Sequence, residues 1–157
     1  MRKAKRVSDS LTEQVQILGQ STLNGYDRLF GGQLMEWIDV VAAVVARRHC
    51  GMNVTTAVVD SLQFKEAAYR NDTVVLKGFM THVGKTSMEI CVETFVENFD
   101  ETRHLINTAY VVMVAIDDFG NPIEVPKLIL ENEEEIRENE AAIRRTELRN
   151  QRRKENF

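Results

Sequence analysis

The stretch that decides the fold reads Asn24-Gly-Tyr-Asp-Arg-Leu-Phe-Gly-Gly-Gln-Leu-Met-Glu-Trp-Ile-Asp39 and continues as Val40-Val-Ala-Ala-Val-Val-Ala46. It predicts a loop, a glycine pair and then a long helix that is apolar on nearly every face and therefore buried. Asp39 lies in the middle of that helix. A carboxylate on a buried helix costs free energy unless it is paired or serves a site. We therefore expect function beside Asp39, with a satisfied structural aspartate as the alternative.

The start of this helix offers the donors that an acyl-transfer site needs. The first N–H groups of a helix have no partner within it, and the helix dipole is positive there. Glycines at 31 and 32 would let a substrate carbonyl come close, so that the Gly32 amide stabilises the oxyanion formed on attack. Asp39 could activate water or attack directly. Asn24 is a weaker candidate, because Asn-Gly is also a common turn.

The spacing of these residues predicts a dimer. Gly32 and Asp39 are seven residues apart, which is about two turns and ~10 Å along one helix. One helix can hardly place both groups at a single carbonyl carbon. If both act, a second copy of the chain supplies one of them.

The rest of the chain predicts an α+β domain in which one long helix is laid against an antiparallel sheet. The helix should end near Gly51, after the basic residues Arg47 and Arg48. Alternating or continuous apolar runs then indicate strands. They are expected within residues 12–21, 55–64, 74–81, 88–93 and 106–116.

The two ends differ from this domain, which we place at residues 12–130. Residues 1–11 are basic at the start and are expected to be a flexible N-terminus. Residues 131–157 contain 15 charged side chains among 27, with acidic residues leading and basic residues trailing. That order suits a helix dipole. We expect a charged, solvated helix, with a partner-docking helix as the alternative.

The composition excludes several classes of function. A net charge of −4 disfavours a nucleic-acid binder, and no apolar run approaches the roughly 20 residues that span a membrane. The scattered histidines predict no metal site, and no Gly-x-Ser-x-Gly elbow supports a serine hydrolase. Cys50 and Cys91 lack metal-ligand spacing and fit a reducing, cytoplasmic setting.

Gly84-Lys85-Thr86 looks like the end of a nucleotide-binding P-loop but fails as one. Five residues separate Gly78 from Gly84 where that motif needs four, and the following residues alternate as a strand. A tight turn with a lysine can still bind a phosphate through backbone N–H groups. On composition alone, a plain hairpin turn is the favoured interpretation.

Taken together, these residues resemble the hotdog-fold acyl-CoA thioesterases, and among them the cytosolic, brain-type acyl-CoA hydrolases and their bacterial relatives. The resemblance extends over roughly residues 12 to 130. Its motifs are the Asn24–Asp39 stretch, Ala42-Ala43, Arg48-His49, Thr56–Phe64 and Val83–Ile90.

The resemblance implies a hotdog fold, in which a sheet wraps a long central helix, and homodimers as active units that often assemble into hexamers as trimers of dimers. It also implies that Asn24 and Asp39 are catalytic and that the backbone amide near Gly32 polarises the thioester. The CoA-binding turn would be Gly84-Lys85-Thr86-Ser87. Asp27 stands where relatives often carry glycine, which bears on substrate preference.

The function we expect is hydrolysis of acyl-CoA thioesters, without a metal or other cofactor. Water attacks the carbonyl with Asp39 as base, or Asp39 attacks as nucleophile, and CoA leaves as the thiolate. The alternatives are a non-catalytic acyl-CoA-binding regulator of the same fold and a structural module assembled through the charged C-terminal helix. Dehydration of a hydroxyacyl thioester usually needs a histidine near the helix start, and none lies between Asn24 and Asp39.

Overall fold

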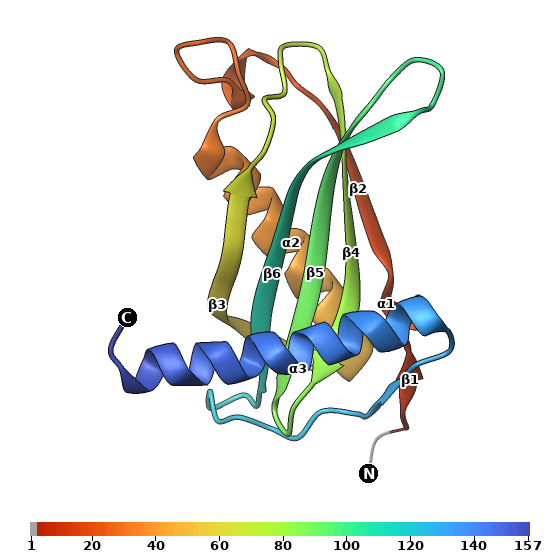
Figure 1. Ribbon diagram of the computed structural model, residues 1–157, viewed down its shortest axis with the longest axis vertical. Coiled ribbons are helices and arrows are strands. Elements are labelled where there is room, and N and C mark those ends of the chain that lie inside the picture. The colour runs from red at the N-terminus through yellow and green to blue at the C-terminus, as the bar shows by residue number, and fades with distance from the viewer. Residues whose placement is uncertain (1–2) are drawn as a thin grey trace.

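The computed structural model describes residues 3–157, which form one long helix packed on a five-stranded antiparallel sheet (Figure 1). The helix is α2 (Gly31–Cys50), and the strand order is β2-β4-β5-β6-β3. The strands are β2 (Thr12–Ile17), β3 (Asn53–Phe64), β4 (Thr73–Val83), β5 (Ser87–Glu97) and β6 (Arg103–Ile116). A short 3-10 helix, η1 (Gln20–Thr22), precedes α2. The predicted α+β hotdog architecture is confirmed.

The core lies between α2 and the inner face of the sheet. The helix buries Leu34, Ile38, Val41 and Val45 there, because apolar residues three and four apart share one face. Gly78 of β4 makes the approach possible, since a Cβ at that position would lie 2.7 Å from a methyl carbon of Val41.

The opposite face of α2 is not covered, which corrects the expectation of a helix buried on all sides. Met35 is 46% exposed and Val40 is 49% exposed. The helix ends as predicted at Gly51, which has a left-handed conformation (φ 67°) and donates its N–H to the Arg47 carbonyl at 2.7 Å. An apolar helix face open to solvent is typical of a surface that another subunit covers.

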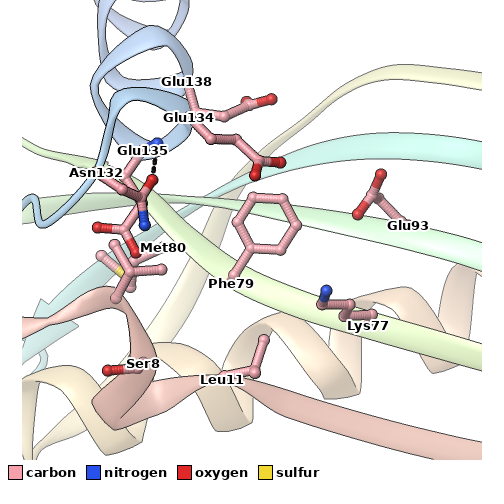
Figure 2. Close-up of a pocket in the computed structure, with 11 residues that line it drawn as sticks. Ser8, Leu11, Lys77, Phe79, Met80, Glu93, Asn132, Glu134, Glu135 and Glu138 are labelled. Atoms are coloured by element: carbon pink, nitrogen blue, oxygen red, sulfur yellow. Dashed lines mark hydrogen bonds between the residues drawn. The ribbon is translucent and has the colours of Figure 1, made fainter.

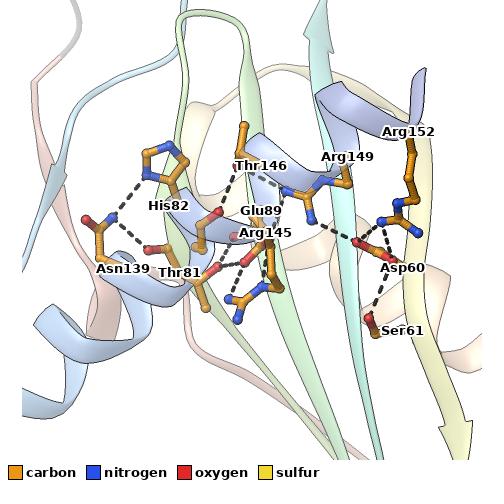
Figure 3. A network of polar contacts seen from close by, with 11 residues as sticks. Asp60, Ser61, Thr81, His82, Glu89, Asn139, Arg145, Thr146, Arg149 and Arg152 are labelled. Atoms are coloured by element: carbon orange, nitrogen blue, oxygen red, sulfur yellow. Dashed lines mark hydrogen bonds and ion pairs between the residues drawn. The ribbon is translucent and has the colours of Figure 1, made fainter. Parts of the chain in front are cut away.

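The charged C-terminal segment forms α3 (Glu133–Lys154), which crosses the outer face of the sheet on the side away from α2 (Figure 1). Asn132 caps its start by accepting the Glu135 N–H at 2.9 Å. We expected a charged, solvated helix; the helix is present and most of its residues are exposed, but one face of it docks on the sheet. Arginines of α3 meet carboxylates on the strands, as Figure 3 shows, and Ala142 is buried against the sheet.

Part of the N-terminal segment that we expected to be flexible is structured. Residues 5–10 form β1 (Lys5–Arg6) and α1 (Val7–Ser10), and β1 pairs in parallel with β7 (Leu128–Ile129). Val7 and Ser10 are buried, and this burial holds the segment in place. The first two residues of the expected segment lie outside the described residues.

Candidate functional site

The loop before α2 is folded around Asn24. Its side-chain oxygen accepts N–H groups from Tyr26 at 2.8 Å and from Arg28 at 3.3 Å, and its backbone N–H donates to the Arg28 carbonyl at 2.8 Å. Asn24 therefore performs the turn role that its sequence context suggested. It is also exposed, so its amide nitrogen can face a ligand.

Aromatic rings stand beside both glycines at the helix start, and the closer contact is at Gly32. A Cβ on Gly32 would lie 2.7 Å from a ring carbon of Phe30, and a Cβ on Gly31 would lie 3.4 Å from the ring of Phe64. Phe30, the residue before the helix, provides no side-chain cap. The first turn of α2 thus presents bare backbone N–H groups between two aromatic rings.

A cavity of about 300 Å³ lies beside this helix start. Asn24 lines it together with apolar side chains from α2, β3 and β6 and with the chain that follows β3. Its lining residues are Asn24, Arg28, Leu29, Leu34, Phe64, Lys65, Glu66, Ala67, Ala68 and Ile106. A pocket that combines apolar side chains with a few polar groups suits an acyl group.

Asp39 is partly exposed on the uncovered side of α2 and takes part in none of the ion pairs found in residues 3–157. Its Oδ1 accepts a hydrogen bond of 2.6 Å from the Thr56 hydroxyl on β3. The sequence analysis placed Thr56 in an ordinary strand and did not connect it with Asp39. The pairing of Thr56 with Met113 on β6 turns its side chain to the inner face of the sheet, toward α2.

The turn between β4 and β5 is a tight hairpin. The Gly84 N–H donates to the Ser87 carbonyl at 2.8 Å, and a Cβ on Gly84 would lie 2.6 Å from the Ser87 hydroxyl. Thr86 precedes the strand, and its carbonyl accepts the N–H of Ala115. Lys85 is exposed. This turn lies at the end of the sheet opposite to the start of α2 (Figure 1), so one chain does not bring Gly84–Ser87 together with Asn24 and Gly32.

The histidines and cysteines of the described chain do not form a metal site, because residues 3–157 contain no cluster of three or more ligands that could hold an ion. His49 is buried and pairs with the Pro126 carbonyl at 2.9 Å; burial lowers its pKa, so it is neutral at pH 7. Burial also raises the pKa of the Cys91 thiol, which makes it a poor nucleophile. No helix in residues 3–157 is long and apolar enough to cross a bilayer.

A second cavity, of about 200 Å³, lies between α1, the outer faces of β4 and β5, and the start of α3 (Figure 2). Phe79 and Lys77 line it, but so do Glu93, Glu134 and Glu138. Burial raises the pKa of Glu93. None of the predicted site residues lies in this cavity, and its carboxylates would repel the phosphates of CoA.

Comparison with known proteins agrees with this geometry. The family model described as "Thioesterase superfamily" matches residues 26–102. An uncharacterised acyl-CoA thioester hydrolase of Bacillus subtilis, YkhA, is 37% identical over 132 residues, which cover 83% of this chain and 77% of that protein. The cytosolic acyl coenzyme A thioester hydrolase of Rattus norvegicus is 34% identical over 82% of this chain. The match spans 35% of the rat protein's length.

Several solved structures are similar to this protein over nearly the whole length of its chain. An apo-hexameric acyl-CoA thioesterase superposes with a TM-score of 0.92 at 36% identity, covering 96% of this chain and 97% of that one. The acyl-CoA hydrolase of Staphylococcus aureus in complex with butyryl coenzyme A, coenzyme A and coenzyme A disulfide superposes with a TM-score of 0.93 at 31% identity. The match covers 98% of this chain and 94% of that one.

Three further solved structures are of single variants of the S. aureus hydrolase, in which an aspartate, an asparagine or a threonine is replaced by alanine. Those three positions are separated by 15 and 17 residues, as are Asn24, Asp39 and Thr56 here. The fold, the relatives and this spacing agree, and the chain therefore belongs to the thioesterase superfamily, among its hotdog-fold acyl-CoA thioester hydrolases.

Proposed function

We propose that this chain hydrolyses acyl-CoA thioesters with Asp39 as general base, at a site completed by a second copy of the chain. The observation that carries this proposal is the 2.6 Å hydrogen bond from Thr56 to Asp39 Oδ1. It fixes one carboxylate oxygen on a side of α2 that the chain leaves uncovered. The other oxygen is then available to a water molecule.

The chemistry follows from what each group can do. Asp39 removes a proton from water as the water attacks the thioester carbonyl, and the oxyanion forms beside the Gly32 amide, where a helix start stabilises negative charge. The tetrahedral intermediate collapses by breaking the C–S bond, and the proton passes to the departing thiolate of CoA. The Asn24 amide orients the carbonyl or the water. Direct attack by Asp39, through an anhydride that water then opens, uses the same groups.

Two copies are needed because Gly32 and Asp39 are about two helical turns apart, ~10 Å along α2. If two β3 strands pair antiparallel at their edges, the two α2 helices lie side by side and run in opposite directions. The β4–β5 turn of one copy then lies at the same end as the cavity of the other. Gly84, Lys85, Thr86 and Ser87 of one copy would hold CoA phosphates while the partner's cavity receives the acyl group. Hexameric relatives support an assembly of such dimers.

Steady-state release of the CoA thiol from short and long acyl-CoA esters tests the assignment of Asp39. Asp39→Asn keeps the shape of the side chain but removes the base, so kcat should fall roughly 10²- to 10⁴-fold. Thr56→Val should lower kcat by a smaller factor and leave KM nearly unchanged, because it only frees the carboxylate to rotate. Thr56→Ser, which keeps the hydroxyl, should retain most of the activity of the parent protein.

The control is the thermal unfolding of each variant, which should match that of the parent protein. A folded Asp39→Asn protein that hydrolyses thioesters at the parent rate would refute the role of Asp39. A parent protein that binds acyl-CoA without releasing thiol would instead favour a non-catalytic regulator.

A further inference from the structure

The buried histidine at the end of α2 takes no part in the chemistry proposed above. His49 is completely buried, and its Nε2 lies 2.9 Å from the carbonyl oxygen of Pro126. A carbonyl only accepts, so Nε2 carries the proton and donates the hydrogen bond. The other ring nitrogen, Nδ1, makes no hydrogen bond. A buried imidazole with one nitrogen unsatisfied costs free energy, so its contact with Pro126 is the one that needs a reason.

The chain around Pro126 is held by a few separate hydrogen bonds. It lies outside the helices and strands, and proline has no N–H of its own. The Ile123 N–H donates to the Ala115 carbonyl at 2.9 Å. Two residues later, the Val125 N–H donates to the Lys85 carbonyl at 2.9 Å. The contact with the histidine fixes this segment to α2, whose apolar residues are anchored in the core.

The backbone couples the two ends of this connection closely. Val125 and Pro126 are adjacent. The proline ring fixes its own φ, and the residue before a proline is confined to extended conformations. A carbonyl that is held at Pro126 therefore limits the directions in which the Val125 N–H can point.

The hydrogen bond from Val125 ends on the turn between β4 and β5. The Lys85 carbonyl and the Thr86 N–H belong to one peptide group, and residues 3–157 contain no cis peptide. In a planar trans peptide these two groups point in opposite directions. The N–H groups of Lys85 and Thr86 donate to no backbone acceptor in that part of the chain. Holding the Lys85 carbonyl thus directs the Thr86 N–H away from Val125, where it is available to an anion.

We propose that His49 is a positioning residue for CoA binding. By holding Pro126, it keeps the Val125 N–H on the turn, and the turn then keeps a free N–H directed toward a phosphate of CoA. This rests on the proposed function, because it assumes that the turn between β4 and β5 binds the phosphates of CoA. His49 is buried, so it acts through the backbone and not on the substrate.

Such a role affects binding more than chemistry. Phosphate contacts bind the ground state and the transition state alike, so their loss raises KM and leaves kcat nearly unchanged. A thioester of pantetheine alone carries no phosphate and should be insensitive to His49. A general distortion of the protein would instead change the hydrolysis of both kinds of thioester.

The experiment measures kcat and KM for butyryl-CoA, and kcat/KM for S-butyryl pantetheine, in the parent protein and three variants. His49→Leu has no donor, and the shorter amide of His49→Asn does not reach Pro126. Each should raise KM for butyryl-CoA roughly three- to ten-fold, as the loss of one hydrogen bond does, so one folded variant of the two is sufficient. His49→Gln carries an N–H as many bonds from the backbone as Nε2 and should keep KM near the parent value. The pantetheine thioester should react equally with all four proteins.

Val96→Ala is the matched control, because Val96 is buried in the core near the end of β5 that is remote from the turn. It should lower the thermal stability and leave KM unchanged.

The proposed function and this inference fail in different ways. If His49→Leu or His49→Asn is folded and keeps the parent KM while Lys85→Ala raises it, the inference is overturned and the CoA-binding turn stands. An equal change for butyryl-CoA and the pantetheine thioester also overturns the inference. If Lys85→Ala leaves KM unchanged, the turn does not bind CoA, and the inference fails with that part of the proposed function.

Discussion

At the scale of single residues, Lys85 is the clearest test of CoA binding. The backbone of its turn is fixed by the Gly84–Ser87 hydrogen bond and by the Val125 N–H, which donates to the Lys85 carbonyl at 2.9 Å, while its side chain is exposed. Phosphate contacts bind ground state and transition state alike. Lys85→Ala should therefore raise KM for acyl-CoA several-fold with a smaller change in kcat, and the effect should shrink as salt screens the charge.

Two controls separate this effect from a general loss of positive charge. Lys154→Ala, an exposed lysine at the end of α3, should leave KM unchanged. A thioester that lacks the nucleotide part of CoA should be insensitive to Lys85→Ala. If KM at low salt is the same with and without Lys85, the turn is a hairpin and no more.

The sequence analysis singled out Asp39 as a candidate because a carboxylate is conspicuous in an apolar helix, but it could not single out Thr56. Threonine is common in strands, so nothing distinguished Thr56 from its neighbour Thr55. Thr56 becomes a candidate through its hydrogen bond to Asp39, 17 positions away, and that contact exists only when β3 lies beside α2.

At the scale of elements, the period of the apolar residues was enough to predict α2 and the long strands, whereas the docking of α3 was not predictable. Glu89 and Asp60 look like outward-facing, solvated residues of amphipathic strands. In the structure, Glu89 pairs with Arg145 at 2.7 Å and with Arg149 at 2.9 Å, and Asp60 pairs with Arg149 and Arg152 (Figure 3). Charge complementarity between distant segments leaves no local pattern in the sequence.

This network predicts a large effect for Glu89→Gln. The Glu89 side chain is 2% exposed and also accepts the Thr81 hydroxyl at 2.6 Å. Removing its charge leaves Arg145 and Arg149 without that counter-ion, so the free energy of unfolding should fall by about 3–5 kcal/mol. Urea unfolding of the variant and the parent protein measures this change in the free energy of unfolding. Glu97→Gln, which breaks a more exposed pair with Arg103, should cost at most about 1 kcal/mol, and equal effects would contradict a structural role for the network.

At the scale of the whole molecule, the uncovered surfaces lie together. Met35 and Val40 are exposed on α2, and β3 is the edge of the sheet nearest to them, with Val59 39% exposed. An unpaired apolar edge invites another strand. A second copy that pairs along β3 would cover both surfaces at once and would bring a second Asp39 beside the first helix.

Shared sites make a prediction that self-contained sites do not. Asn24→Ala and Asp39→Asn should each inactivate the protein. When the two variants are co-expressed, a mixed dimer with shared sites has one site with both defects and one site with neither, so its activity should recover towards half of the parent value. Two self-contained sites would each keep one defect, and mixing would restore nothing. Purification of the mixed dimer through two different affinity tags, followed by the thiol-release assay, measures the recovery. A mixed dimer no more active than either parent variant would exclude the shared site even if the unmodified protein is an active thioesterase.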